Sequence, residues 1–598
     1  MAESSGDRRR RGDAPQAPPH VLREYAILAD GERGAVVGPR GDIAWLCFPR
    51  WDSAPVFSAL LGGHGVYSVA PRDPFVWGGS YENGTLIWHS RWVTHTGIVE
   101  SREALAYPAD PHRMILLRRV RAIDAPGLVA VWLRPRGDND RRPWRELHRH
   151  GDTWTARVDN LYLRWTGGAG AHARDRRGGL LLHLDLAAGE HHDLVLELSD
   201  RPLIDEGVDA DTAWRATDAA WRDAVPACDA ALNPRHTRHS YAVLRGLTGR
   251  GGGMVAAATT GLPERSDAGR DYDYRYVWIR DQCYAGQAAA TIGPDPLLDD
   301  AARFVAERLL ADGDKLAPAY TVLGEPVPSQ HRLGLPGYPG GSDLVGNWVN
   351  QQFQLDAYGE ALLLFAAAAG HDRLDGRHWD AVEVAVQAIE RHWTEPDAGI
   401  WELHDRAWTH SRLIAAAGLR AIASAIIGNS SSYRTAGRGW LTLADRIVAD
   451  TSAHALHPDG RWQRNPDDPQ VDAALLLPGL RGATSADDPR ARATFDAYLR
   501  DLTDDGYAYR FRHDARPLPE AEGSFLLCGF LVALTHHRYG DATRARSWYE
   551  ITRSATGPAR LFSEEYDATQ QQMRGNLPQA FVHALHLETA HRLAADDR

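Results

Sequence analysis

The sequence has few cysteines and no long apolar run. Its four cysteines lie far apart along the chain, and no two of them form a CxxC motif: Cys47, Cys228, Cys283 and Cys528. This spacing excludes a recognisable zinc or redox motif and gives no disulfide framework. Because no stretch of about eighteen consecutive apolar residues occurs, the sequence predicts no membrane-spanning helix and no membrane partner.

The sequence also lacks features that would indicate secretion, nucleic-acid binding or a cofactor. Residues 1–20 contain four consecutive arginines and several prolines but no apolar segment, so we expect a disordered tail and a cytoplasmic protein. A net charge of −12 argues against a nucleic-acid partner. The paired histidines have no ligand at metal-binding spacing, and Gly251–Gly253 reads as a flexible turn. The sequence therefore predicts neither a metal nor a cofactor.

The 598 residues are too many for a single core, and their pattern changes near residue 230. Residues 21–210 contain short β-rich runs separated by turn signals such as Asn83-Gly84 and Pro126-Gly127. These runs predict an antiparallel β-sandwich, with strands near 86–89, 114–117, 128–133, 161–165, 180–184 and 194–198.

The remainder of the chain has a helical pattern. Residues 211–232 read as a helical linker, and residues 233–598 have the apolar period of helices. We expect twelve helices, near 235–249, 280–292, 296–311, 347–369, 377–394, 409–427, 437–453, 470–480, 487–503, 522–538, 541–555 and 577–594. Helix counting alone does not choose among all-α folds.

Three segments carry groups that sugar chemistry requires. Glu402 lies in Gly399-Ile400-Trp401-Glu402, and Glu564 lies in Leu561-Phe562-Ser563-Glu564-Glu565-Tyr566-Asp567, followed by Gly575-Asn576-Leu577-Pro578-Gln579-Ala580-Phe581. Two carboxyl groups that flank a glycosidic bond can donate a proton and activate water. The third segment, 272–281, contributes aromatic rings and the pair Arg280-Asp281, whose donors and acceptor suit hydroxyl groups.

Each of these features also has a simpler interpretation. An isolated glutamate such as Glu402 is most often a solvated loop residue, and Glu564-Glu565 reads as a charged surface turn. Asp281 is favoured near a helix start by the helix dipole alone. Tryptophan, of which there are 20, suits pyranose rings but is also common in protein cores.

Taken together, the three segments make the chain resemble glycoside hydrolase family 15, the family of glucoamylases and bacterial trehalases, from about Tyr25 to the last helix. The resemblance implies an (α/α)6 toroid after the β-sandwich, with its site in a funnel built from loops at one end. It implies that Glu402 is the general acid and that Glu564, directly after Ser563, is the general base. If that stretch is extended, Glu565 points to the opposite face. The implied substrate-binding residues are Tyr274, Trp278, Arg280, Asp281, Asn347, Gln352 and Trp401.

The resemblance implies an inverting, exo-acting α-glucosidase of the glucoamylase type, which releases β-D-glucose from non-reducing ends of oligosaccharides. A trehalase that hydrolyses α,α-trehalose is the alternative, because both enzymes hold the same terminal glucose in the first subsite. An inactive glycan-binding relative is a third interpretation, disfavoured because both glutamates are present. The partner is thus an α-glucoside oligosaccharide or disaccharide, and the sequence leaves room for a homo-oligomer. The segment 45–57 also matches the family and either touches substrate through Arg50 and Asp52 or seals a domain interface.

Overall fold

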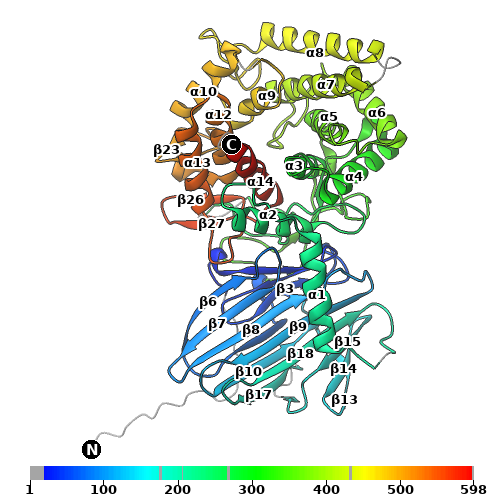
Figure 1. Cartoon of the computed structure of the whole chain (residues 1–598), viewed down its shortest axis with the longest axis vertical. Helices are drawn as coiled ribbons and strands as arrows, with labels where there is room; N and C mark the ends of the chain where they lie inside the picture. Colours follow the sequence, from blue (N-terminus) through cyan, green and yellow to red (C-terminus); the bar gives the residue numbers. More distant parts are fainter. Residues whose placement is uncertain are drawn as a thin grey trace, which may run out of the picture.

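The computed structural model describes residues 19–173, 178–204, 206–265, 270–429, 434–485 and 487–595. The tail predicted for residues 1–20 lies outside this part, except for its last two residues. Figure 1 shows β-sheets at one end of the molecule and a ring of helices at the other. Helix α1 (Ala210–Ala224), in the predicted linker, runs beside the sheets toward the ring (Figure 1).

Two antiparallel sheets of eight strands form the N-terminal part. The first sheet has the order β1-β2-β3-β5-β10-β17-β16, with β4 paired to β3, and the second has the order β13-β14-β15-β18-β9-β8-β7-β6. The strands of the first sheet are β1 (Ala26–Ala29), β2 (Gly34–Val37), β3 (Ile43–Cys47), β4 (Pro55–Phe57), β5 (Val66–Pro71), β10 (Gly127–Arg134), β16 (His172–Ala173) and β17 (Leu180–Leu186). Those of the second are β6 (Phe75–Tyr81), β7 (Trp88–Thr94), β8 (Ile98–Leu105), β9 (Arg113–Ala122), β13 (Arg145–His150), β14 (Thr153–Val158), β15 (Leu161–Thr166) and β18 (His191–Ser199).

The strands follow the expected alternation of side chains. In β17 the leucines at 182, 184 and 186 are buried, whereas His183 and Asp185 between them are exposed. A strand with one face on the core produces this period of two. Five of the six predicted strands lie within β9, β10, β15, β17 and β18, and the sixth overlaps the start of β7. The predicted antiparallel sandwich is confirmed.

The helices form two concentric layers (Figure 1). In the described part of the chain, six inner helices follow one another around the ring, each contacting the next, and α14 contacts α3 to close it. The inner helices are α3 (Ile279–Ala290), α5 (Asp356–Ala369), α7 (Thr409–Asn429), α9 (Leu477–Leu480) with the preceding 3-10 turn, α12 (Leu526–Arg538) and α14 (Ala580–Ala595). The outer helices are α2 (Pro234–Leu247), α4 (Pro296–Asp312), α6 (Gly376–His392), α8 (Arg434–His454), α10 (Pro489–Asp501) and α13 (Ala542–Ser554). This alternation is the predicted (α/α)6 toroid.

Side-chain pattern decides which layer a helix joins. Every residue of α12 from Leu526 to His536 is buried, as expected for a helix that is surrounded by other elements. The next helix, α13, buries only Ala545, Tyr549 and Thr552, which share one face. The inner helix α12 is therefore buried around its circumference, and the outer helix α13 is buried along one stripe.

Glycines allow two inner helices to approach closely. A side-chain carbon at Gly359 in α5 would lie 2.7 Å from backbone atoms of Ile414 and Ala415 in α7. In the other direction, one at Gly418 would lie 2.4 Å from the carbonyl oxygen of Gly359. Neither position has room for a Cβ atom, so this pair of helices packs backbone against backbone.

The helix predicted for residues 347–369 begins only at Asp356, which corrects that prediction. Asn347 accepts a hydrogen bond from the backbone N–H of Val349 through its side-chain oxygen (3.0 Å), and a short 3-10 turn, Val349–Gln351, follows. Gln352 is then extended, with φ −98° and ψ 149°. Because the asparagine side chain bonds to its own local backbone, it favours a turn over a helix here.

The helix predicted for 577–594 likewise starts later, at Ala580, so Pro578 precedes its first turn. None of the helices among the described residues is both long enough and apolar enough to cross a membrane.

Candidate active site

A cavity of about 130 Å³ lies at the end of the ring where the inner helices begin. Its lining comes from segments that precede α3, α5, α7, α12 and α14, or from the first turns of α3 and α14. The lining residues are Ala256, Glu264, Arg270, Tyr272, Tyr274, Trp278, Arg280, Asp281, Tyr284, Asn347, Trp348, Ile400, Trp401, Glu402, Leu403, Arg510, Phe511, Phe525, Glu564, Gln579 and Phe581. Residues that are far apart in the sequence thus meet because the segments that carry them lead into, or begin, inner helices.

Glu402 is held by donors on one of its two carboxyl oxygens. Trp278 donates its indole N–H to Glu402 Oε1 (2.7 Å), and the amide of Gln354 donates to the same atom (3.3 Å). The Arg280 Nη2 atom lies 3.5 Å from it. All hydrogen bonds that the described residues make to this carboxyl use Oε1, so Oε2 remains available to a ligand.

The backbone of the loop before α7 aims Glu402 at the cavity. Gly399 has φ +67° and Glu402 has φ +53°, so the short turn contains two left-handed residues. A side-chain carbon at Gly399 would lie 2.8 Å from the Trp408 ring, which explains the need for glycine at this position. A glutamate at positive φ is uncommon and is a feature often associated with functional sites.

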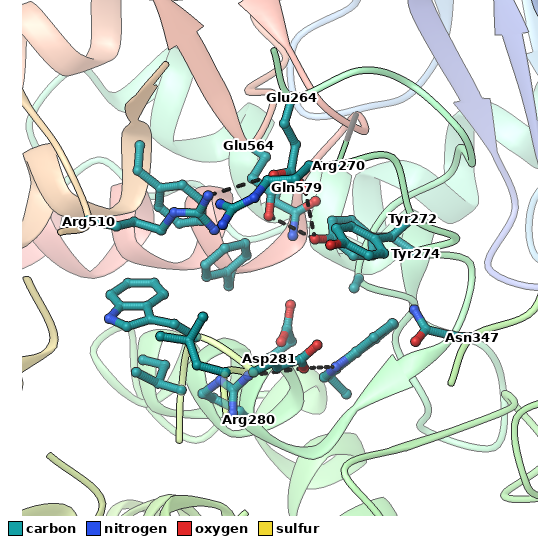
Figure 2. Close-up of a pocket in the computed structure, with 18 of the residues that line it drawn as sticks. Glu264, Arg270, Tyr272, Tyr274, Arg280, Asp281, Asn347, Arg510, Glu564 and Gln579 are labelled. Carbon is teal, nitrogen blue, oxygen red and sulfur yellow. Dashed lines mark hydrogen bonds and ion pairs between the residues drawn. The ribbon is translucent and has the colours of Figure 1, made fainter. Parts of the chain in front are cut away.

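Glu564 lies in the opposite wall (Figure 2). Figure 2 shows Glu564, Glu264 and Arg510 on one side of the cavity, with Arg280 and Asp281 on the other. Tyr274 donates its hydroxyl to Glu564 Oε1 (3.0 Å), whereas Glu564 Oε2 is buried and accepts no hydrogen bond from the part of the chain that the structure describes. Burial and the neighbouring Glu264 raise the pKa of Glu564 well above its usual value.

Glu565 points away from the cavity. It begins β26 (Glu565–Asp567), and its carboxyl accepts from Arg510 (3.0 Å) and from the backbone N–H of Gly523 (3.1 Å). Glu564 and Glu565 therefore face opposite sides, as expected for neighbours in extended backbone.

Arg510 connects several buried acidic groups. Its guanidinium binds Glu565, contacts Glu522 and lies 3.6 Å from Glu264 Oε2. Burial opposes the charge on Arg510, but these carboxylates outweigh it and raise the pKa of its guanidinium. One cation is thus shared by a group of carboxyl groups that have almost no solvent contact.

Aromatic rings line both sides of the space between the two carboxyl groups. Tyr272 and Tyr274 stack with ring centroids 6.3 Å apart, and Trp278 meets Tyr274 edge to face at 5.5 Å. Trp401 meets Phe525 edge to face at 5.6 Å. Flat apolar faces of this kind suit the C–H faces of a pyranose ring.

Several buried polar atoms at the cavity wall have no hydrogen-bond partner among the described residues. Three of them are acceptors, Asp281 Oδ1, Glu564 Oε2 and Gln579 Oε1. The indole Nε1 of Trp401 is a donor, and the hydroxyl of Tyr284 can donate or accept. Buried polar atoms are normally hydrogen-bonded, so such a set indicates a ligand that brings many hydrogen-bonding groups. A polyhydroxylated ring between the aromatic faces meets this requirement.

Asp281 lies in the first turn of α3 and is almost completely buried. Burial raises its pKa to about 7; Arg280 opposes this shift and Glu402 adds to it. Arg280 itself is fixed by Gln354 (2.8 Å) and Asp356 (3.1 Å). The pair is therefore rigid, and the Asp281 carboxyl offers its free oxygen to a ligand.

The structure brings together eight of the nine residues that the sequence singled out. Gln352 is the exception, because it does not line the cavity; it accepts from Gln354 (2.9 Å), which in turn contacts Glu402. The side chain of Asn347 lines the cavity, although it also bonds to backbone atoms of Asp273 and Val349.

Sequence reasoning missed six polar residues of the lining: Glu264, Arg270, Tyr272, Tyr284, Arg510 and Gln579. Tyr272 opens the segment already recognised, and Arg510 lies in an alternating aromatic and arginine stretch, Tyr509-Arg510-Phe511-Arg512. Glu264 has no comparable signal, because nothing in Leu262-Pro263-Glu264 sets it apart from an ordinary turn.

The N-terminal segment 45–57 contacts the loop before α3 through Arg275. This buried arginine donates to the carbonyl oxygen of Trp51 (3.1 Å), contacts Cys47 Sγ (3.3 Å), and is paired with Asp273 (2.7 Å). Arg50 and Asp52 do not line the cavity. The segment therefore seals the interface between the sheets and the ring, the second of the two roles considered for it.

No group of three or more His, Cys, Asp or Glu side chains is placed to hold a metal ion in the described ranges.

Comparisons with known proteins agree with this arrangement. The family model of glycosyl hydrolases family 15 matches residues 243–591, and a model described as trehalase-like, N-terminal, matches residues 8–151. The chain is 30% identical to a trehalase of Mycolicibacterium smegmatis, over 96% of this chain and 92% of the relative. It is also 30% identical to a trehalase of Mycobacterium tuberculosis, over 96% of this chain and 90% of the relative.

Among solved structures, a bacterial glucoamylase complexed with acarbose matches with a TM-score of 0.70 and covers 96% of this chain and 97% of that chain. At 13% identity this likeness concerns the fold alone. The fold and the cavity, together with these matches, define an enzyme that hydrolyses glycosidic bonds. The chain belongs to glycoside hydrolase family 15.

Proposed function

We propose that the protein is a trehalase, which hydrolyses α,α-trehalose to two molecules of glucose with inversion at one anomeric carbon. The observation that carries this choice of substrate is similarity to trehalases along both parts of the chain, sheets and helical ring alike. The motifs in the sequence favoured a glucoamylase-type enzyme, with trehalase as the alternative, and the comparisons support the alternative better.

The positions of the two carboxyl groups support a division of roles between Glu402 and Glu564. Glu402 uses one oxygen for Trp278 and Gln354, so its other oxygen can hold a proton toward the glycosidic oxygen. Glu564, on the opposite wall, has a buried oxygen without a partner that can accept a proton from water. In this mechanism Glu402 protonates the leaving oxygen as the C1–O bond breaks, and water activated by Glu564 bonds to C1 from the other face.

The glucose that is attacked occupies the floor of the cavity. Arg280 and Asp281 lie there beside Glu402, and Asp281 and Tyr284 have free polar atoms for the hydroxyl groups remote from the scissile bond. Tyr274 lies next to Glu564, where its oxygen can favour positive charge that develops at the anomeric centre. Trp278 and Trp401 supply ring faces.

A glucoamylase-type activity on maltose and related oligosaccharides is the second candidate. It uses the same first subsite and the same two carboxyl groups, so the geometry around Glu402 and Glu564 does not separate the two substrates. We expect the fit of the second sugar to separate them, near Arg270 and the exposed Trp348, which both line the cavity.

The test is the purified full chain assayed on trehalose, maltose, isomaltose and maltotriose, with early products followed by proton NMR. We expect the highest kcat/KM on trehalose. Because inversion affects only the glucose that is attacked, trehalose should first give α-glucose and β-glucose in equal amounts. Two molecules of α-glucose would contradict inversion, and faster release from maltose than from trehalose would favour the glucoamylase-type candidate.

Asp281→Asn should weaken catalysis on every α-glucoside. The amide cannot reproduce the charged acceptor that this buried site offers, and leaving a buried polar group unpaired costs roughly 1–3 kcal/mol. We expect kcat/KM to fall by about ten- to a hundredfold, and by a similar factor on trehalose and maltose. Measuring both substrates with the wild type and the variant checks this, since a loss confined to one linkage would place Asp281 in the second subsite.

A further inference from the structure

A second carboxyl group lies beside Glu564. Glu264, in the loop before α3, lines the same cavity, and the side chains of both glutamates are almost completely buried. The hydroxyl of Tyr274 lies 3.0 Å from Glu564 Oε1 and 3.5 Å from Glu264 Oε1. Figure 2 shows the two glutamates side by side, with Tyr274 reaching both.

The backbone of Gly575 packs against both glutamates. A side-chain carbon at Gly575 would lie 3.1 Å from Glu564 Oε2 and 3.6 Å from Glu264 Cγ, so the backbone of Gly575 covers the pair. Gly575 has φ +76°, and its N–H donates to the carbonyl oxygen of Pro263 (2.7 Å), which ties this cover to the residue before Glu264.

The charges around the pair do not balance two carboxylates. The nearest guanidinium, Arg510, already contacts Glu522 and Glu565 and lies 3.6 Å from Glu264. Two carboxylates in contact in a buried site repel each other strongly, so such a pair keeps one proton over a wide pH range. Burial raises the pKa of both glutamates. The contact between them raises the pKa of Glu564 further and lowers that of Glu264, so in the free enzyme the shared proton rests on Glu564. The titratable and charged groups that face the pair or its partners are Tyr272, Tyr274, Arg270, Glu402, Arg510, His513, Glu522 and Glu565.

We propose that Glu264 is a positioning residue that shares one proton with Glu564 and takes over that proton when substrate binds and Glu564 acts as the general base. The proposal deepens the proposed function of Glu564 and rests on it. Glu264 in its protonated form donates a hydrogen bond to the Glu564 carboxylate, and Tyr274 donates a second one. Two donors fix the carboxylate toward the water and stabilise its charge.

With this assignment, the protons taken up and released in the reaction balance. Before the attack Glu402 and Glu264 are protonated and Glu564 is a carboxylate. The C1–O bond of the substrate breaks as Glu402 gives its proton to the leaving oxygen, a bond forms between C1 and the water oxygen, and Glu564 takes the proton of that water. Glu264 keeps its own proton throughout, and the pair returns one proton to solvent when Glu402 is protonated again.

Two substitutions of Glu264 separate the role of its proton from that of its charge. Glu264→Gln resembles the protonated acid, because the amide can donate to Glu564; we expect kcat to stay within about tenfold of the wild type. Glu264→Leu has similar size but no donor, so kcat should fall by more than about tenfold further. The first ionisation of a pair that shares a proton is favoured by the hydrogen bond within the pair. Glu564 beside a leucine lacks that bond, whereas an amide can still supply it, so the acidic limb of kcat/KM should move upward by about one pH unit in the leucine variant alone.

The matched control is Glu520→Gln, which changes an exposed glutamate in α11 (Leu518–Ala521) that does not line the cavity. It should leave both kcat and the pH profile unchanged. A leucine variant that is less stable but has a wild-type pH profile would make Glu264 a structural partner of Arg510 only. A glutamine variant as inactive as the leucine variant would mean that the charge of Glu264 is needed, and would overturn the proposal.

A measurement without substrate keeps this inference separate from the proposed function. Infrared difference spectra of the full chain report protonated carboxyl groups directly. The measurement is made at pH 8, because this pH is above the pKa of about 7 that burial gives Asp281, Glu360 and Asp397, so these three groups contribute less to the signal. We expect the wild type to show one protonated carboxyl that both Glu264→Gln and Glu564→Gln lack. Its presence in a chain that cleaves no α-glucoside would count against the proposed function alone, whereas its absence from the wild type would overturn the shared proton.

Discussion

Glu564→Gln should lower kcat on trehalose by at least about a hundredfold, because the amide cannot accept the proton of the attacking water. Glu402→Gln should cause a loss of at least similar size, because it removes the proton that the leaving sugar needs. Both variants keep the shape of the side chain, so substrate binding should change much less than turnover. Steady-state kinetics on trehalose, with KM and kcat measured separately, checks this.

A substrate with a better leaving group distinguishes the acid from the base. Fluoride leaves from α-glucosyl fluoride with little help from a proton donor, so Glu402→Gln should recover much of its lost rate on this substrate. Glu564→Gln should remain impaired on both substrates, because water still has to be activated. Equal recovery in both variants would contradict the assignment of the two roles.

Glu565→Gln is the comparison for Glu564→Gln, since the two residues are neighbours but face opposite sides. Glu565 binds Arg510 and the backbone of Gly523, outside the cavity lining. Its replacement should lower stability more than turnover at a temperature where the variant is folded. If Glu565→Gln is inactive while Glu564→Gln retains a near-normal rate, the base has been assigned to the wrong glutamate.

Arg510→Met should destabilise the protein by about 3–5 kcal/mol at neutral pH, the range found when one partner of a buried ion pair is removed. Methionine fills much of the same space, but it leaves Glu264, Glu522 and Glu565 without the guanidinium that they share. The matched control is Arg512→Met, two residues along, where the arginine is exposed and bonds only to the backbone carbonyls of Arg516 and Asp501. That change should stay within about 0.5 kcal/mol of the wild type.

The effect of Arg510→Met should depend on pH in a defined direction. Arg510 lowers the pKa values of Glu264 and Glu565, which burial raises. Without the arginine, these two pKa values rise further above their unfolded values, so the folded state holds protons that the unfolded state has lost. Stability is then retained below the unfolded pKa of about 4.3 and is lost as pH rises above it. Urea unfolding followed by circular dichroism should show a larger difference from the wild type at pH 8 than at pH 5. A difference that does not change with pH would mean that lost packing, and not charge, accounts for the destabilisation.

The sequence predicts the architecture well because both parts of the chain repeat a simple pattern. Alternating side chains in segments such as 180–186 indicate strands with one buried face, and apolar helices alternate with amphipathic ones through the second part. The same local reasoning fails at residues 347–355, where Asn347 bonds to the backbone of Val349 and delays the helix to Asp356. Side-chain bonds to nearby backbone compete with helix formation, and apolar periodicity does not reveal them.

The candidate site was predicted only in part, for a related reason. Glu402 and Glu564 lie in dense motifs, and Arg280 and Asp281 adjoin aromatic residues, so each has a local signal. Glu264 has none, because its importance comes from contact with residues some 300 positions away: Tyr274 joins it to Glu564. A buried group of charges that forms only when three loops meet has no signature in any one of them.

The contact that Arg275 makes with the N-terminal part has a consequence for the independence of the two parts. Arg275 lies between Tyr274, which contacts Glu564, and Trp278, which contacts Glu402, and it is anchored on the carbonyl oxygen of Trp51 and on Cys47. The strand and loop that carry these anchors therefore serve as a foundation for both carboxyl groups, although no strand of the sandwich lines the cavity in the described residues. A helical ring separated from its sandwich would keep every catalytic residue but lose the contacts that fix the spacing of the two carboxyl groups. The functional unit is therefore the chain from the first sheet to the last helix.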